Sequence, residues 1–268
     1  MIILSITNHN EASACIYDKK KNIIYAASEE RFVRKKNYKG FPRKSINFLL
    51  KKLDINLDQI NKFVYCTAST IHPSKKIKKQ IDSELKDLND YDKKIYLKRL
   101  KTEIQFNKKY ITNFKNWLKK NKIKKNKVSY IDHHEAHARS SILCQKKNNG
   151  YILTADGKGG FTSSAIWKFV KNKLICLSRN TSFNSLGYLY GNVTILLGYK
   201  AERHEGKITG LSSYGEYQQD IDFTKSVISL GSNTANACAP IIKLLNEKVG
   251  VERVFINTIH GYSNSNRF

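Results

Sequence analysis

The sequence predicts an α/β protein built from two related halves. Three short runs rich in β-branched and aromatic residues open the chain, and three similar runs recur about 149 residues later. Segments with apolar residues three and four positions apart lie between the two sets, which is the spacing of amphipathic helices. Strands that alternate with such segments indicate a layered α/β architecture. A chain of 268 residues is long enough for one large domain or two modest ones.

The first half begins with three expected strands joined by polar turns, namely Ile2–Thr7, Ser13–Tyr17 and Ile23–Ser28. Pro42 then starts a predicted helix, and Phe63–Thr67 is the next strand candidate. Helical spacing resumes over residues 75–127, and a strand is expected again at 128–131. We therefore expect a first lobe over residues 1–131 that carries a helical insertion at about 75–127.

The second half repeats this order of elements. Its expected strands are Tyr151–Ala155, Thr162–Phe169 and Leu174–Ser178, and a turn is expected at Asp156–Gly160. Two such meanders, each followed by helices and a further strand, describe the duplicated fold of actin, hexokinase and Hsp70 (the ASKHA fold). In that fold a nucleotide binds in the cleft between the lobes. We expect the second lobe over residues 132–268.

The charge of the chain is strongly positive and unevenly distributed. Half of the net charge of +26 lies in residues 75–127, where 18 Lys and one Arg face six acidic residues. Dedicated recognition of phosphates or bases would be expected to use more Arg than this sequence contains. We interpret the surplus as a solvated lysine-rich face, with nucleic-acid binding as the less favoured alternative.

The cysteines and the N-terminal segment indicate a cytoplasmic protein. The five cysteines are odd in number and far apart, without the close spacing of a zinc ribbon or a redox motif, which fits a reducing compartment. The first seven residues lack the basic region of a signal peptide and are typical of a buried strand. No stretch approaches the roughly 18 apolar residues of a membrane span.

A histidine cluster follows the strand at residues 128–131. His133 and His137 are four positions apart, so on a helix that begins at Asp132 or His133 both imidazoles reach one ligand. His134 would point away from them, into packing or a supporting role. Asp156 ends an apolar strand, where a carboxylate is costly unless it is paired or bound to a metal. Two imidazoles and one carboxylate suit Fe(II), with Zn²⁺ or Mn²⁺ as alternatives.

Five blocks of sequence resemble the carbamoyltransferases that modify nodulation factors, aminoglycosides and surface sugars. In chain order they are Glu29–Lys36 with Phe41-Pro42, His133–Ala138, Asp156-Gly157, Ser185–Tyr190, and Glu205–Leu211 with Tyr214-Gly215. Together they cover roughly residues 1–216. Each block alone is a weak signal, and it is their shared order that carries the resemblance.

The resemblance implies a two-step reaction. Carbamoyl phosphate and ATP form carbamoyl-adenylate, and the carbamoyl group then passes to a hydroxyl of a sugar or secondary metabolite. It implies a metal held by His133, His137 and Asp156, beside the nucleotide in the cleft, where the ion would stabilise developing charge. Lys36 would be a cation that faces the substrate.

The first loop departs from the family pattern because it is one residue longer. Either His9 or Asn10 would therefore occupy its polar position, with His9 the better general base and loop capping as its alternative role. The resemblance also implies a set of cofactor-binding residues: Asn10, Gly157, Gly187, Glu205, Lys207 and Asn236. For Glu205 and Lys207, a structural ion pair is an equal alternative.

The resemblance ends after Gly215. The segment Gly231–Asn236 loosely resembles the nucleotide loop of the family, while the fourth metal ligand and the second domain have no counterpart. We expect a second lobe that is truncated or divergent after about residue 216. A truncated or internally deleted chain would show this pattern, and so would a divergent short branch for which a separate chain supplies the carbamoyl-adenylate-forming domain. Two alternatives stay open: a tRNA threonylcarbamoyl transferase-like protein, which would suit the basic charge, and a degenerate lobe that binds a nucleotide or a partner without turnover.

Overall fold

The computed structural model describes residues 1–9, 11–143, 148–171, 173–201, 203–211, 243, 246–247 and 250. The chain divides into two compact units, Met1–Ser185 and Leu186–Phe268, which are described separately. Asn10 and Asn236, two of the predicted cofactor-binding residues, lie outside the described residues.

A five-stranded mixed sheet forms the first layer of unit 1, in the order β3-β2-β1-β4-β5. Its strands are β1 (Ile2–Thr7), β2 (Ser13–Asp18), β3 (Ile23–Ser28), β4 (Lys62–Tyr65) and β5 (Val128–Tyr130). The first three pair antiparallel, while β4 and β5 add to the β1 edge in parallel. Each strand lies within two residues of the predicted bounds, because alternation of buried and exposed side chains is a local signal.

A separate antiparallel sheet is formed by β6 (Asn149–Gly159), β7 (Thr162–Val170) and β8 (Lys173–Thr181). The turn expected at Asp156–Gly160 is wrong in detail, because β6 continues to Gly159. The regular pairing with β7 is interrupted between Ala155 and Gly159. Such an irregularity bends a strand and redirects its side chains, which releases Asp156 from the ordinary alternation.

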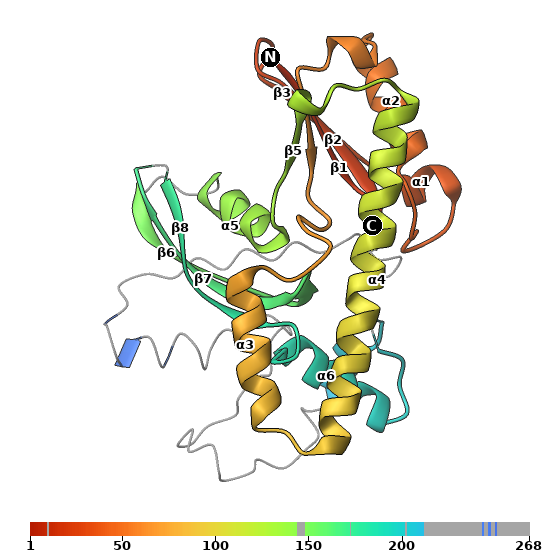
Figure 1. The fold of residues 1–268 in the computed structure, drawn as a ribbon. Helices are drawn as coiled ribbons and strands as arrows, with labels where there is room; N and C mark the ends of the chain where they lie inside the picture. Colours follow the sequence, from red (N-terminus) through yellow and green to blue (C-terminus); the bar gives the residue numbers. More distant parts are fainter. Residues whose placement is uncertain are drawn as a thin grey trace. The chain divides into compact units, whose positions relative to one another are not determined.

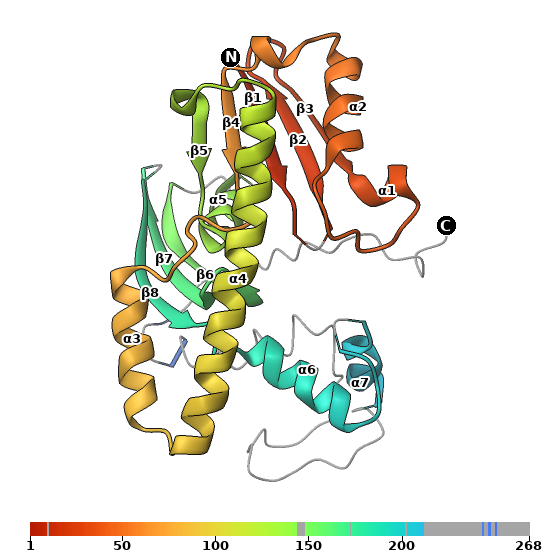
Figure 2. The ribbon, with the colours of Figure 1, turned by 45° about the vertical axis from the view of Figure 1, so that its right-hand side comes forward.

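The helices of unit 1 are α1 (Glu29–Val33), α2 (Arg43–Leu53), α3 (Lys75–Lys86), α4 (Asp90–Lys120) and α5 (His133–Leu143). Two short 3-10 helices lie at Leu57–Gln59 and Lys125–Lys127. The lysine-rich segment therefore forms two helices, α3 and α4, which run side by side in both ribbon views (Figures 1 and 2). Ser74 and Asn89 cap their first turns by accepting hydrogen bonds from backbone N–H groups. The α/β class predicted from the sequence is confirmed.

Three hydrophobic cores hold unit 1 together. The largest joins the five-stranded sheet to α2 and to the C-terminal half of α4, with Phe63, Leu49 and Phe114 fully buried in it. A second core lies between α5 and the β6–β8 sheet around Trp167. The third joins α3 and the N-terminal half of α4 to Phe161 at the start of β7. Helix α4 therefore contributes residues to the first and the third core. Each large side chain buried in this way contributes about 1.5–3 kcal/mol to the stability of the fold.

Unit 2 contributes two described helices, α6 (Leu186–Leu196) and α7 (Glu205–Leu211). They are joined by a hydrogen bond between the hydroxyls of Tyr190 and Thr209 (2.6 Å). Among the helices that the structure describes, none is both long enough and apolar enough to span a membrane.

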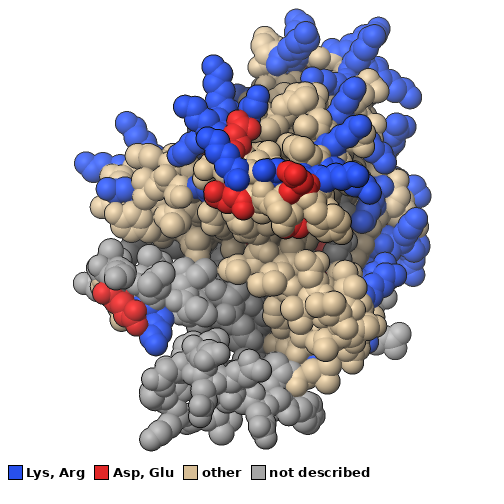
Figure 3. All heavy atoms as spheres, turned by 60° about the horizontal axis from the view of Figure 1, so that its bottom comes forward, with Lys and Arg blue, Asp and Glu red and all other residues tan. Residues whose placement is uncertain are grey.

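Lysine and arginine side chains project over much of the surface that the described residues present in Figure 3, with a few acidic side chains among them. Most lysines of α3 and α4 are exposed. In this view the cationic side chains lie mainly in the upper part and along the right-hand edge of the described surface (Figure 3).

Candidate metal centre

Helix α5 starts where the sequence predicts, directly after β5. The Asp132 carboxylate accepts a hydrogen bond from the N–H of Glu135 (3.1 Å) and so caps the first turn. Arg179 of β8 holds the same carboxylate through an ion pair of 3.0 Å, and the Arg179 guanidinium lies 4.8 Å over the Trp167 ring. Both contacts fix the position of the helix start against the β6–β8 sheet, and with it the position of His133.

His134, the next residue of α5, anchors this helix to the β6–β8 sheet. Its side chain is fully buried, and its two nitrogens lie 3.1 Å from Oγ1 of Thr154 and 3.0 Å from the carbonyl of Thr162. Burial lowers the pKa of His134 to about 4, so the ring is neutral at neutral pH. Because a carbonyl only accepts, Nε2 carries the hydrogen and Nδ1 accepts from the Thr154 hydroxyl. This ring therefore packs and orients, and it is not available to a metal.

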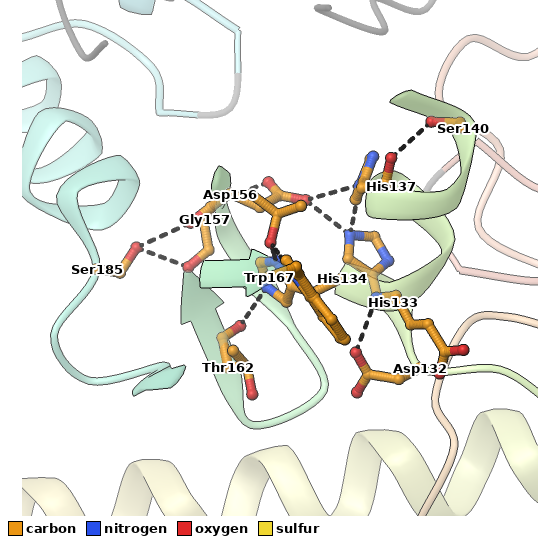
Figure 4. A network of polar contacts seen from close by, with 12 residues as sticks. Asp132, His133, His134, His137, Ser140, Asp156, Gly157, Thr162, Trp167 and Ser185 are labelled. Carbon is orange, nitrogen blue, oxygen red and sulfur yellow. Dashed lines mark hydrogen bonds and ion pairs between the residues drawn. The ribbon is translucent and has the colours of Figure 1, made fainter. Parts of the chain in front are cut away.

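Three side chains converge beyond it, as Figure 4 shows. His133 and His137 project from α5 toward Asp156 at the end of β6. Nε2 of His133 lies 2.8 Å from Oδ2 of Asp156 and 3.0 Å from Nε2 of His137, and the latter lies 3.8 Å from the same carboxylate oxygen. The prediction that these residues lie together is matched by the geometry, since their candidate donor atoms fall within 4.8 Å of one another.

The geometry of the three donors fits a single small cation. Bonds of about 2.1 Å at tetrahedral angles put neighbouring donors about 3.4 Å apart, and the three observed separations lie on both sides of that value. The side chains are 29%, 36% and 42% exposed for His133, His137 and Asp156, so open coordination positions would face solvent. Nitrogen and carboxylate donors with open positions are typical of Fe(II), Zn²⁺ and Mn²⁺ sites.

The Asp156 carboxylate is held in its ionised, metal-binding form. Burial by itself would raise the pKa of Asp156, but hydrogen bonds from His133 and His137 and from the N–H of Gly157 hold that pKa well below its usual range. The backbone around it is fixed as well. Oγ of Ser185 donates to the carbonyls of Gly157 (2.7 Å) and Asp156 (3.4 Å).

Gly159 lies directly against the side chain of His133. A Cβ at this position would lie under 3.0 Å from three atoms of the His133 side chain, so only glycine permits the observed approach. A Cβ at Gly157 would instead meet no atom within 4 Å. The open space beside Gly157 is compatible with the predicted cofactor contact, which stays a prediction.

His9, the predicted general base, lies close to this cluster. His133 and Asp156 both act electrostatically on its ring, and the ring packs edge-on against Tyr110 with centroids 4.8 Å apart. Burial, followed by the charges of Lys158 and Lys39, lowers the pKa of His9 to about 4. A neutral imidazole next to the cluster can accept a proton, although a low pKa makes it a weak base. Lys39 and Lys158 are further cations near His9 that the sequence did not reveal.

Lys36, the predicted substrate-side cation, is exposed in the loop after α1, and within the described part of the chain no hydrogen bond or ion pair joins it to the cluster. The neighbouring Glu29 has a structural role. Its buried carboxylate accepts hydrogen bonds from the N–H groups of Lys44 and Ser45 at the start of α2. This pairing of a carboxylate with a helix N-terminus accounts for one acidic residue of the first motif block.

Gly187, Glu205 and Lys207 belong to unit 2. Gly187 lies exposed in the first turn of α6, and Glu205 starts α7. The Lys207 ammonium lies 5.6 Å from the centre of the Tyr199 ring, within the range of a cation–π contact. The predicted roles of all three in cofactor binding stay predictions.

Comparison with known proteins gives one family and several relatives. Residues 2–234 match the family model described as the carbamoyltransferase N-terminus. An uncharacterized protein of Methanocaldococcus jannaschii is 30% identical over 224 residues, which are 84% of this chain and 35% of that protein. Nodulation protein NolNO of Sinorhizobium fredii is 26% identical over 208 residues, 78% of this chain and 28% of that protein.

The chain therefore spans about a third of the length of the curated relatives that it matches along most of its length. A segment of 46 residues is 50% identical to glyceraldehyde-3-phosphate dehydrogenase of Clostridium pasteurianum. That segment amounts to 17% of this chain and 14% of the dehydrogenase, too little to show a shared fold or activity.

Proposed function

Because this chain belongs to the carbamoyltransferase family through its N-terminal domain, we propose that it carries the metal-binding part of an O-carbamoyltransferase. The observation that carries the proposal is the convergence of His133, His137 and Asp156 on one point, open to solvent. The donor would be carbamoyl-adenylate, formed from carbamoyl phosphate and ATP, and the acceptor a hydroxyl of a sugar or secondary metabolite. Adenylate formation is assigned to a domain outside these 268 residues.

The residues of the chain have distinct parts in this proposal. Asp156 stays ionised and, with the two imidazoles, would hold Fe(II), Zn²⁺ or Mn²⁺. Such an ion, when bound, supplies positive charge that stabilises the charge developing on the transferred group. His9 would accept the proton of the attacking hydroxyl, and its neutral state at neutral pH supports this role. The open backbone at Gly157 leaves room for the adenylate.

We further propose that the two sheets of unit 1 belong to the two lobes of a duplicated actin-like fold. The support is that β1–β2–β3 and β6–β7–β8 are both antiparallel meanders whose strands follow in the same order.

A direct transfer assay tests the function. The purified chain is loaded with Fe²⁺, Zn²⁺ or Mn²⁺ and supplied with carbamoyl-adenylate and a panel of sugar hydroxyl acceptors, and carbamoylated product is followed by mass spectrometry. Product formation that is lost in His137→Ala and kept in Arg139→Ala, a change two residues further along the same helix, supports the proposal. Purified protein that holds none of these metals, and takes none up, overturns it.

The net charge of +26 favours the tRNA-directed alternative, and this alternative can be tested by the salt dependence of binding to tRNA. Nonspecific phosphate contacts weaken steeply with salt. Retention on immobilised tRNA at 300 mM salt would favour a threonylcarbamoyl transferase-like protein, whereas elution at lower salt would agree with a solvated lysine-rich face.

A further inference from the structure

The segment Thr181–Ser185 begins at the last residue of β8, and it contacts the lysine-rich helices on one side and the candidate metal centre on the other. Its last residue, Ser185, donates hydrogen bonds to the backbone carbonyls of Asp156 and Gly157. Its earlier residues contact side chains of α3 and α4 and residues in and next to β7. The segment therefore lies between the helical pair and one of the three metal donors.

Glu84 of α3 holds two residues of this segment. Its carboxylate accepts from the hydroxyl of Thr181 at 2.8 and 2.9 Å and from the side-chain amide of Asn184 at 2.8 Å. The hydroxyl of Tyr96 on α4 donates to the same carboxylate at 2.6 Å. Thr181 is fully buried. Several short hydrogen bonds to one ionised group make a rigid connection, because charge-assisted bonds are stronger than neutral ones.

Glu103 of α4 holds the residue between them. Its carboxylate is 2% exposed and accepts from the buried hydroxyl of Ser182 at 2.8 Å. Its other oxygen faces Nε of Arg99 at 3.5 Å and Nζ of Lys158 at 3.9 Å. Lys158 lies two residues after Asp156 on β6, so Glu103 contacts side chains of both the Thr181–Ser185 segment and β6. Because a buried carboxylate that loses its partners is costly, these contacts hold the Glu103 side chain in one position.

Phe183 completes the attachment. Its ring stacks on the ring of Tyr96 with centroids 3.5 Å apart, and the Arg99 guanidinium lies 4.8 Å from the centre of the Phe183 ring. Tyr96 and Arg99 both belong to α4. Every residue from Thr181 to Ser185 thus has a specific partner, and the partners of the first four include side chains of α3 or α4.

We propose that the α3–α4 pair positions Asp156 for metal binding, with Glu84 and Glu103 as positioning residues that act through Thr181–Ser185. The inference rests on the proposed metal centre and deepens it. It gives the lysine-rich helices a role that depends on their inner, acidic contacts rather than on their charged outer surface.

A cobalt titration tests the inference. Co²⁺ takes nitrogen and oxygen donors as Zn²⁺ does, and its visible absorption reports the coordination geometry. Glu103→Gln and Glu84→Gln each remove a negative charge from the attachment. We expect each to weaken Co²⁺ binding by about tenfold to a hundredfold, the range found when partners of metal ligands are changed, and to alter the absorption spectrum. Asp82→Asn is the matched control, because Asp82 is an exposed acid on α3 whose loss changes the charge equally.

Ser185→Ala keeps the test decisive where a buried substitution prevents folding, since it deletes only the hydroxyl that contacts the Asp156 backbone. Wild-type Co²⁺ affinity and an unchanged spectrum in Ser185→Ala and in the folded glutamate variants would overturn the inference, even with a lowered Tm. Failure of the wild-type chain itself to bind Co²⁺ would overturn the metal centre and this inference together. The two outcomes are distinguishable without any measurement of carbamoyl transfer.

Discussion

Substitution of Gly159 by alanine tests how closely β6 and α5 must approach to assemble the metal centre. The added Cβ would lie under 3.0 Å from Cβ, Cγ and Cδ2 of His133, whereas ordinary contacts start at 3.4 Å. Movement of about 1 Å is therefore required from the imidazole or from the strand. Overpacking of this kind costs about 1–3 kcal/mol. Because 1.4 kcal/mol corresponds to a factor of ten, metal affinity should fall by about fivefold to a hundredfold if the strain is relieved at His133.

Two measurements on Gly159→Ala follow from this estimate. Isothermal titration with Zn²⁺ should show the loss of affinity, and thermal unfolding without metal should show whether the backbone has absorbed the strain. A domain of this size loses about 2–4 °C of Tm per kcal/mol. Gly157→Ala is the matched control, because a Cβ there meets no atom within 4 Å. Equal affinity and equal Tm in Gly159→Ala and the wild type would refute the close approach of Gly159 to His133.

Three further predictions concern the same region. His134→Ala deletes a buried ring and its hydrogen bonds to Thr154 and Thr162, and should lower the unfolding free energy in denaturant titrations by about 2–4 kcal/mol. His137 is partly exposed, so His137→Ala should lower the unfolding free energy of the metal-free protein by less. The folded pKa values of His9 and His134, both about 4, lie below the usual 6.5, so the unfolded chain binds more protons. Stability should be constant above about pH 7 and fall as the pH drops from 6.5 to 4, and a flat profile between pH 7 and 5 would contradict both burials. Metal at a hundred times its Kd should add about 2.7 kcal/mol, so a chelator should lower the Tm of the wild type and leave His137→Ala unchanged.

The elements of the fold that could be predicted are those with local signals. The alternation in Ile2–Thr7 and Ile23–Ser28 specifies strands at the residues where they occur, because one face of each is buried. The spacing of His133 and His137 places both imidazoles on one side of α5 through helix geometry alone. Asp156 could be paired with them because a carboxylate at the end of an apolar strand needs a partner.

The features that could not be predicted depend on contacts between distant residues. The need for glycine at 159 arises from the irregular pairing of β6, which brings the backbone against His133. Glu84 and Glu103 sit among many lysines, and their partners follow 79 to 100 residues later in the chain. A pattern of charges therefore predicts a solvated helix surface and carries no signal for the two acids that face inward.

The three candidate donors lie on consecutive elements, α5 and β6, and His133 and Asp156 are separated by 23 residues. An ion bound between them would act as a cross-link that closes a short loop between a helix and a strand. By analogy with a disulfide over a loop of similar length, such a cross-link would lower the conformational entropy of the unfolded chain and stabilise the fold by about 3 kcal/mol. Without the ion the chain would then be easier to unfold and degrade, so its abundance in a cell would follow the supply of the metal.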